Sequence, residues 1–332
     1  MKKLLFFTLL LLIGLILLTG CSETADQAEQ AARDENGGEE EVELPSVMEQ
    51  TVPLLQEWPF QVTDQVGRVV TIEDIPQSIV SLSPSNTEML FALGLGDRVT
   101  GVTEFCNYPA EALEKPKVGG FNTPSIEKIV EIEPDLVLAS TIHEQEVPFL
   151  EELGLTVLVV ESSNLHELYS TLSLIAEVAG DPLAGEELIA KMTERISAVE
   201  TALSVVSPEE KIKVYYEVYS DPLMSAGSGA LINEIIALAG GINIFGDVEE
   251  KYPTISAEVV AERQPQIIIF PDYHGSADIV FDEMASRPGW ENIPAVLDNR
   301  IYAITDDSFV RPGPRVVEAV EEAARLFYPD LF

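Results

Sequence analysis

Short apolar runs alternate with segments of helical periodicity along most of this chain. The apolar runs predict buried strands at residues 99–102, 136–139, 156–160, 214–219, 267–270 and 301–305. In the segments between them apolar residues recur every three or four positions, which is typical of amphipathic helices that cover a sheet. Because helices and strands alternate in this way, the pattern favours an α/β fold with mainly parallel sheets.

One stretch of this pattern occurs twice. The segment FNTPSIEKIVEIEPDLVLAS, from Phe121, aligns without a gap with YPTISAEVVAERQPQIIIFP, from Tyr252, at a spacing of 131 residues. Each copy predicts an aromatic loop, a serine N-cap, a helix of two turns and a buried strand. The matched residues are Phe121 with Tyr252, Ser125 with Ser256, Glu127 with Glu258, Ile129 with Val260, Glu131 with Glu262 and Pro134 with Pro265. The repeat therefore predicts two related lobes, each with a central, mainly parallel sheet flanked by helices.

A shorter match supports the repeat. The segments EMLFALG at Glu88 and EIIALAG at Glu234 both predict helix ends that are closed by a glycine, Gly94 and Gly240. The first of these helices follows the run SIVSLSPSNTE, in which Ser85 and Glu88 have the spacing of a capping box. We therefore expect a strand, a turn and a helix start at this point of the chain.

A single long helix is predicted between the lobes. Asp181 is suited to its N-cap and Pro182 to its first position, and Ser207-Pro208 ends it. A helix of about 24 residues is about 36 Å long, enough to join the lobes as a stiff strut. The predicted organisation is an N-terminal lobe at 58–180, a linking helix at 181–206 and a C-terminal lobe at 207–332.

The N-terminus has the pattern of an export signal. Lys2 and Lys3 precede an apolar run over residues 4–18, so residues 1–20 predict a signal peptide. The sequence Leu-Thr-Gly-Cys that ends at Cys21 resembles the lipobox of bacterial lipoproteins, whose cysteine becomes the lipidated N-terminus after cleavage. Residues 21–57 predict a disordered, acidic tether. We therefore expect lipidation of Cys21 and a location on the extracytoplasmic face of the cell membrane.

Charge and cysteine content narrow the choice of function. The formal net charge is -38, and a nucleic acid requires a basic face, so we expect no nucleic-acid partner. Cys106 is the one cysteine besides Cys21. Once Cys21 is acylated, the mature chain has a single free thiol, so an intramolecular disulfide is excluded. We expect a monomer whose stability comes from apolar cores.

Few residues suggest an enzyme. The run SAGSGA at Ser225 lacks the G-x-S-x-G order of a nucleophile elbow. His143 and His274 each follow a predicted strand at equivalent ends of the two lobes, so a zinc site built from both is one alternative. A catalytic zinc needs a third protein ligand, which the sequence does not single out. A secreted metal-dependent hydrolase remains open as an alternative.

Aromatic residues cluster in loops where open α/β sheets bind ligands. Phe105, Tyr108, Phe121, Tyr252 and Tyr273 all fall just after predicted strands or just before predicted helices. Phe121 and Tyr252 also match in the repeat, so they can face each other across the gap between two lobes. A flat or macrocyclic ligand requires such a pair of rings.

The chain resembles the substrate-binding lipoproteins of ABC importers for cobalamin and ferric siderophores, whose two lobes are joined by a single helix. The resemblance covers residues 58–332 and is carried by SIVSLSPSNTEMLFALG, VTGVTEFCNYP, PSIEKIVEIEPDLVLAS, GGINIF, RPGWENIPAVLDNRIYAI and RPGPRVVEAVEEAARLFYP. The run SLSPSNTE followed by GVTEFCNYP is most similar to the cobalamin-binding members. The resemblance implies a ligand cleft between the lobes, no catalysis, no metal and no cofactor.

The resemblance also implies roles for individual residues. Aromatics that contact the corrin ring fall on Phe105, Phe121 and Tyr252, although the family often has tryptophan at the last two positions. The glutamates that dock the transporter, one per lobe, fall on Glu127 and Glu258. The implied partners are ABC permease subunits, their ATPases and a small corrinoid or iron chelate.

Arg311 leaves the choice of ligand open. Siderophore binders of this fold use arginines against the negative charge of the ligand, and Arg311 is a candidate for that role. A ferric-siderophore or haem receptor is therefore the alternative within the family.

Overall fold

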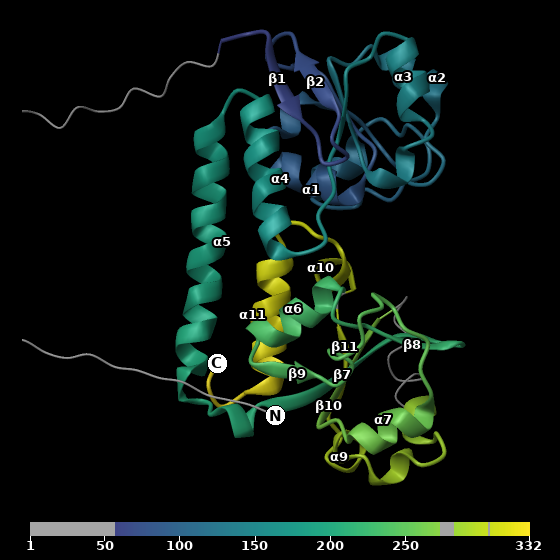
Figure 1. Ribbon diagram of the computed structural model, residues 1–332, viewed down its shortest axis with the longest axis vertical. Helices are drawn as coiled ribbons and strands as arrows, with labels where there is room; N and C mark the ends of the chain where they lie inside the picture. Colours follow the sequence, from purple (N-terminus) through teal and green to yellow (C-terminus); the bar gives the residue numbers. More distant parts are fainter. Residues whose placement is uncertain (1–56, 273–281, 305) are drawn as a thin grey trace, which may run out of the picture. The chain divides into compact units, whose positions relative to one another are not determined.

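Two mainly parallel sheets organise the described part of the chain, and each is built around one copy of the repeat (Figure 1). The computed structural model describes residues 57–272, 282–304 and 306–332, all of which belong to one compact unit. The predicted signal peptide and the predicted tether up to residue 56 lie outside the described residues. We call the part before helix α5 (Pro182–Ala202) the N-terminal lobe and the part after it the C-terminal lobe.

The N-terminal lobe has a hairpin and a four-stranded sheet. The hairpin, which the sequence pattern did not predict, pairs β1 with β2 in antiparallel fashion, and the sheet has the parallel order β4-β3-β5-β6. The elements are β1 (Phe60–Thr63), β2 (Val69–Ile72), β3 (Ile79–Ser81), α1 (Pro84–Ala92), β4 (Val99–Val102), α2 (Ile126–Ile132), β5 (Leu136–Ala139), α3 (Val147–Glu152), β6 (Val157–Val159) and α4 (Leu165–Val178).

The C-terminal lobe has a five-stranded sheet. Its strands β9, β7, β10 and β11 are parallel in that order, and β8 pairs with β7 in antiparallel fashion. The elements are β7 (Ile212–Ser220), β8 (Leu223–Ser225), α6 (Leu231–Leu238), β9 (Gly241–Asn243), α7 (Ala257–Arg263), β10 (Ile267–Pro271), α9 (Pro294–Leu297), β11 (Ile301–Ile304), α10 (Asp306–Val310) and α11 (Val316–Phe327).

The structure confirms the two related α/β lobes. Along the chain, strands β3, β4, β5 and β6 of one lobe correspond to β7, β9, β10 and β11 of the other. Corresponding strands also occupy the same places in the two sheets, whose spatial orders are β4-β3-β5-β6 and β9-β7-β10-β11. Ser125 and Ser256 both cap their helices through the side chain, as the repeat predicts. Glu133 and Gln264, again 131 residues apart, both end those helices in the left-handed conformation. The duplicated sequence therefore sets the same helix boundaries in both lobes.

Two helix-end predictions had different outcomes. Gly94 and Gly240 follow α1 and α6 with φ values of +76° and +80°, which is the conformation expected of a glycine that closes a helix. The capping box from Ser85 to Glu88 is wrong, because α1 begins at Pro84 and its N-cap is Ser83, without a side-chain cap. Proline at the first helical position starts the helix, and Glu88 is released for another contact.

Helix α5 (Pro182–Ala202) joins the lobes and continues as a 3-10 turn over Leu203–Val205. The side chain of Asp181 caps it by accepting a hydrogen bond from the N–H of Ala184, and Met192, Ile196 and Val199 form its buried stripe. In the part of the chain that the structure describes, this helix and all others are too short or too polar to cross a membrane.

One apolar core extends through both lobes. Along β5 and β10 alternate residues face opposite sides, so that Leu136 and Ile267 join the same large cluster of buried residues. This shared core also contains the buried faces of α4, α5, α6 and α11. The other face of each sheet packs on a smaller local cluster, one under α2 and α3 and one under α7 and α9. The lobes therefore meet through packed helices as well as through one connecting chain.

Candidate functional site

Two of the predicted ligand aromatics border one hollow in the N-terminal lobe. A hollow of about 460 Å³ is lined by Phe105, Gly120, Phe121, Asn122 and Thr123. Phe105 is 57% exposed, although a phenylalanine side chain is normally buried. A large exposed ring beside a second aromatic ring is a surface that an apolar, flat ligand can cover.

Backbone geometry positions the loop that carries Phe121. Gly119 has a φ of +110°, and a Cβ atom there would lie 2.8 Å from both the Ser125 nitrogen and the Thr123 oxygen. Only glycine fits so close an approach of two backbone segments. The N–H of Ser125 also donates to the carbonyl oxygen of Val118 at 2.7 Å, which closes the loop just before α2.

His143 contacts the loop that lines the hollow. Its Nε2 lies 2.7 Å from the carbonyl oxygen of Phe121, and its Nδ1 accepts the N–H of Ser140 at 3.0 Å. Both ring nitrogens are therefore engaged with backbone groups, and the side chain is buried. This arrangement contradicts the zinc-ligand role of His143 that the hydrolase alternative needed, because neither nitrogen offers a free lone pair. His274 lies outside the described residues.

Tyr252 occupies the corresponding place in the C-terminal lobe. It is half-buried, and the Nζ of Lys251 lies 5.6 Å from its ring centroid. Thr254 in the same loop bridges to Met224 of β8, so the loop is tied to the sheet. Tyr252 thus matches Phe121 in sequence and in its position just before the repeated helix. Tyr273 lies outside the described residues.

A cluster of ion pairs joins the lobes at Glu88. The carboxylate of Glu88, in α1, is only 3% exposed and accepts two hydrogen bonds from Arg315, at 2.8 and 2.6 Å. Arg311 lies 3.4 Å from the same carboxylate and 2.8 Å from Asp307, and it donates to the side-chain oxygen of Asn107 at 2.6 Å. Arg311, predicted as a ligand residue, therefore already has partners in both lobes.

A matched glutamate also bridges the lobes. Glu234, which corresponds to Glu88 in the shorter repeat, accepts the backbone N–H of Leu165 at the start of α4 at 2.9 Å. Sequence reasoning missed both contacts, because it interpreted Glu88 and Glu234 only as parts of helix ends. Their equivalent positions in EMLFALG and EIIALAG were the signal that could have identified them.

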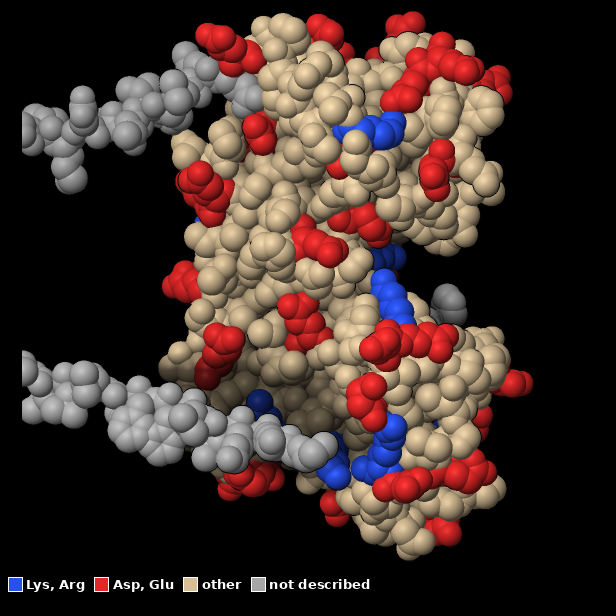
Figure 2. All heavy atoms as spheres, viewed as in Figure 1, with Lys and Arg blue, Asp and Glu red and all other residues tan. Residues whose placement is uncertain are grey.

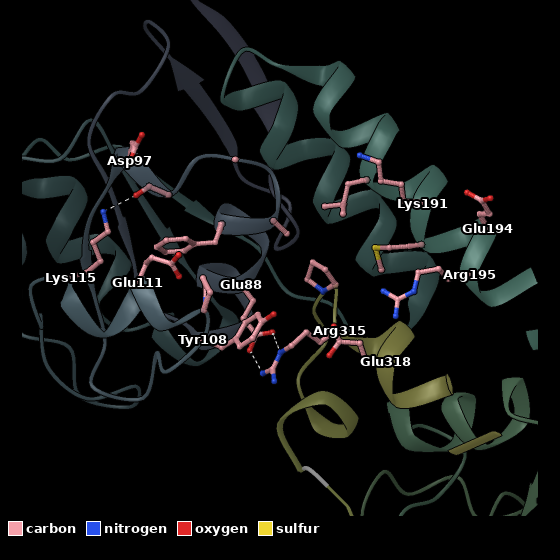
Figure 3. Close-up of a pocket in the computed structure, with 18 residues that line it drawn as sticks. Glu88, Asp97, Tyr108, Glu111, Lys115, Lys191, Glu194, Arg195, Arg315 and Glu318 are labelled. Atoms are coloured by element: carbon pink, nitrogen blue, oxygen red, sulfur yellow. Dashed lines mark hydrogen bonds and ion pairs between the residues drawn. The ribbon is translucent and has the colours of Figure 1, made fainter. Parts of the chain in front are cut away.

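Tyr108 lies apart from the hollow and lines a second groove of about 860 Å³ (Figure 3). Its ring stacks on Arg315, with 4.1 Å between the guanidinium carbon and the ring centroid. Figure 3 shows Glu88 and Arg315 pointing toward each other near the middle of this groove, with Lys191, Glu194 and Arg195 extending from α5 on one side and Asp97 and Lys115 on the other. Acidic and basic side chains alternate around the groove, which gives a ligand no single sign of charge to recognise.

The two predicted docking glutamates are exposed in the first turns of α2 and α7. The hydroxyl of Ser256 and the N–H of Glu258 itself donate to the carboxylate of Glu258, and these bonds lower the pKa of that group. Glu258 therefore remains negatively charged at neutral pH. Figure 2 shows other acidic side chains spread over both lobes on the visible face, so position, more than charge alone, distinguishes Glu127 and Glu258.

Of the two cysteines in the sequence, the structure describes only Cys106. Cys21 lies outside the described residues. Cys106 is fully buried, with its sulfur 3.1 Å from the hydroxyl of Thr87 and 3.2 Å from that of Thr103. Its thiol supports the loop that carries Phe105 and is not exposed to the hollow.

The architecture defines a class of binding protein: two repeat-related α/β lobes joined by one long helix, with candidate ligand residues in matched loops. Residues 79–308 match the family described as Periplasmic binding protein. The chain belongs to that family.

Individual relatives agree with this class. The ABC transporter substrate-binding lipoprotein YvrC of Bacillus subtilis is 31% identical over 331 residues, which cover 97% of this chain and 96% of that protein. A vitamin B12-binding protein of Vibrio cholerae is 31% identical over 248 residues, covering 74% of this chain and 87% of that protein.

Solved structures show the same fold. The periplasmic vitamin B12-binding protein BtuF of Vibrio cholerae superposes with a TM-score of 0.65 at 28% identity, over 77% of this chain and 98% of that one. The periplasmic haem-binding protein RhuT of Roseiflexus sp. RS-1 gives 0.67 at 27% identity, over 77% of this chain and 99% of that one.

The first prediction concerns the ion cluster between the lobes. Glu88→Gln should lower the free energy of unfolding by about 3–5 kcal/mol, because it leaves the charge of Arg315 without its buried partner. Glu318→Gln is a matched control, since Glu318 lines the same groove but is exposed, and it should change stability by less than about 0.5 kcal/mol. Urea denaturation measures both, and equal effects of the two variants would contradict the role of Glu88.

Proposed function

We propose that this chain is a lipid-anchored, extracytoplasmic receptor that captures a corrinoid of the cobalamin type and delivers it to an ABC importer. The observation that carries the proposal is the hollow in which Phe105 and Phe121 stand beside each other, with Phe105 largely exposed. Tyr252 supplies a matched ring from the other lobe. Two aromatic surfaces from two lobes suit a broad macrocycle, because stacking on both faces removes the most apolar area from water.

The described residues that line the hollow carry no charged side chain, which supports a corrinoid over an anionic ligand. In siderophore or haem recognition, arginines would pair with the negative groups of the ligand. Here Arg311 and Arg315 already pair with Glu88 and Asp307. A carboxylate of haem would have to displace these partners, and a formal net charge of -38 further opposes an anion. The amide side chains of cobalamin are uncharged, so they can bind without displacing these carboxylates from the arginines.

A haem or ferric-siderophore receptor is the second candidate. It is favoured by the likeness to a haem-binding protein at 27% identity, close to the 28% of the vitamin B12-binding structure. The aromatic hollow suits a porphyrin as well as a corrin. The two candidates therefore differ in the charge that the site must accept.

Ligand titration tests the proposal. Purified protein should bind cobalamin and cobinamide more tightly than haem or a hydroxamate siderophore in isothermal calorimetry. Phe121→Ala and Tyr252→Ala should each weaken cobalamin binding by about 1–3 kcal/mol, the scale of one large buried ring contact, with little change in stability.

Phe149→Ala is the matched control for these ring deletions. Phe149 is an exposed phenylalanine of α3 that does not line the hollow, so its removal should leave the affinity unchanged. Tighter binding of haem than of cobalamin would favour the second candidate. Parental affinity in both aromatic variants would exclude the proposed stacking.

We further propose that Glu127 and Glu258 dock the receptor on the two permease subunits. Their equivalent positions suit a transporter with two related membrane subunits, because each lobe then presents the same contact. Both side chains are exposed at the starts of short helices that follow the aromatic loops. Charged groups at the rim of an interface set encounter and register.

Charge reversal separates docking from ligand binding. The double variant Glu127→Lys with Glu258→Lys should retain ligand affinity and lose ligand-stimulated ATPase activity of the reconstituted importer, because like charges would then meet. Glu131→Lys with Glu262→Lys is the matched control: both residues are exposed, lie on the same helices and are also 131 residues apart. Full stimulation with the first pair, or loss with both pairs, would exclude a specific docking role.

The proposed anchor is the acylated Cys21. Several acyl chains on one residue hold a protein on a membrane stably, whereas one chain does not. Cys21→Ala should therefore release the protein from the membrane fraction or leave it as an unprocessed precursor. Fractionation followed by immunoblotting measures this. Normal cleavage together with full membrane retention of the variant would argue against the anchor.

A further inference from the structure

His143 is fully enclosed directly behind the proposed ligand surface. It lies in a 3-10 helix (Thr141–His143) that follows β5, and its side chain is 1% exposed. It does not line the hollow, whereas Phe121 does. Because His143 contacts Phe121, it can influence a ligand indirectly through that residue.

Two contacts link His143 to Phe121. The first is the hydrogen bond of 2.7 Å between Nε2 and the carbonyl oxygen of Phe121. The second is an edge-to-face contact of the two rings, with centroids 5.6 Å apart and an angle of 89° between the planes. This geometry is the favoured one for aromatic pairs. Backbone and side chain of Phe121 are thus held by the same residue.

The partners of His143 fix its tautomer. The N–H of Ser140 can only donate, so Nδ1 must accept from it and carry no proton. The neutral ring then has its proton on Nε2, which donates to the carbonyl of Phe121. Because Ser140 directly follows β5, the imidazole connects the aromatic loop to the parallel sheet.

We propose that His143 is a positioning residue for ligand capture, which orients the Phe121 ring toward the ligand without contacting the ligand itself. This inference rests on the proposed role of Phe121 in binding. The other ties to the rest of the lobe act at the base of the loop, at Gly119 and Ser125, and the remaining bond, from the N–H of Thr123 to the carbonyl oxygen of Gly120 at 3.4 Å, stays within the loop itself. Without His143, the tip of the loop would keep its base and lose its fixed orientation.

Two conservative variants separate the contact of His143 with Phe121 from its contact with Ser140, which caps the 3-10 helix. In His143→Asn the amide oxygen can replace Nδ1 as acceptor for Ser140, but the side chain is too short to reach Phe121. In His143→Gln the amide nitrogen can replace Nε2 as donor to Phe121. We expect the asparagine variant to bind cobalamin roughly 3- to 10-fold more weakly than the parent, in keeping with one aromatic contact. The glutamine variant should recover most of that loss.

A double-mutant cycle with Phe121→Ala gives the decisive comparison. Once the Phe121 ring is absent, His143→Asn should change the cobalamin affinity less than about twofold, since the two residues act as one unit. The same loss of affinity in both backgrounds would overturn the proposal, because it would show a general structural effect of His143.

A ligand-free measurement keeps this inference distinct from the proposed function. Backbone amides of residues 120–123 should exchange with solvent faster in His143→Asn than in the parent or in His143→Gln. Unchanged exchange in the asparagine variant would overturn the proposal even if cobalamin binds. If no corrinoid binds the parent, the proposed function fails, and this exchange comparison still decides whether His143 orients the loop.

Nitrogen NMR of the parent imidazole adds a test that does not depend on the folding of any variant. We expect a neutral ring with its proton on Nε2. A proton on Nδ1 would overturn the proposal.

Discussion

The shared apolar core is the constraint on which the rest of the structure depends. Each sheet packs one face on this core, together with the buried sides of α4, α5, α6 and α11. Apolar surface costs about 25 cal/mol per Å² to expose, so each ~400 Å² exposed on separating two lobes would cost on the order of 10 kcal/mol. A ligand of micromolar affinity contributes about 8 kcal/mol in total. The space between the matched aromatic loops is therefore set by packing, and a ligand has to fit it.

Duplication gives both lobes the same framework, and the two copies differ in some of the residues built on it. The serine caps and the left-handed helix ends are the same in both lobes. Glu88 and Glu234 both bridge to the opposite lobe, but one accepts from an arginine and the other from a backbone N–H. The proposed ligand rings also differ, phenylalanine in one copy and tyrosine in the other. These two differences lie at the boundary between the lobes and in the matched aromatic loops.

Much of the fold could be predicted from local sequence signals, whereas contacts between residues far apart in the chain could not. Strands, helix caps and the long helix follow from periodicity and from single residues such as Asp181, which act within a few positions of the chain. The ion pair of Glu88 with Arg315 joins residues from different lobes, and no local pattern encodes it. A zinc site with His143 stayed open as an alternative because the two backbone partners of this residue are visible only in the folded chain. The capping box failed because Pro84 starts the helix earlier.

The central claim is that the matched aromatic loops form one corrinoid site. Arg311 and Arg315 already pair with carboxylates of this chain, which favours an uncharged macrocycle over an anionic ligand that needs a free arginine. A crystal structure of the protein with cobalamin tests this claim most directly. The account predicts the corrin ring between Phe121 and Tyr252, with Arg311 still paired to Asp307. Cobalamin bound in the groove beside α5, or arginines turned away from their carboxylates toward the ligand, would contradict it.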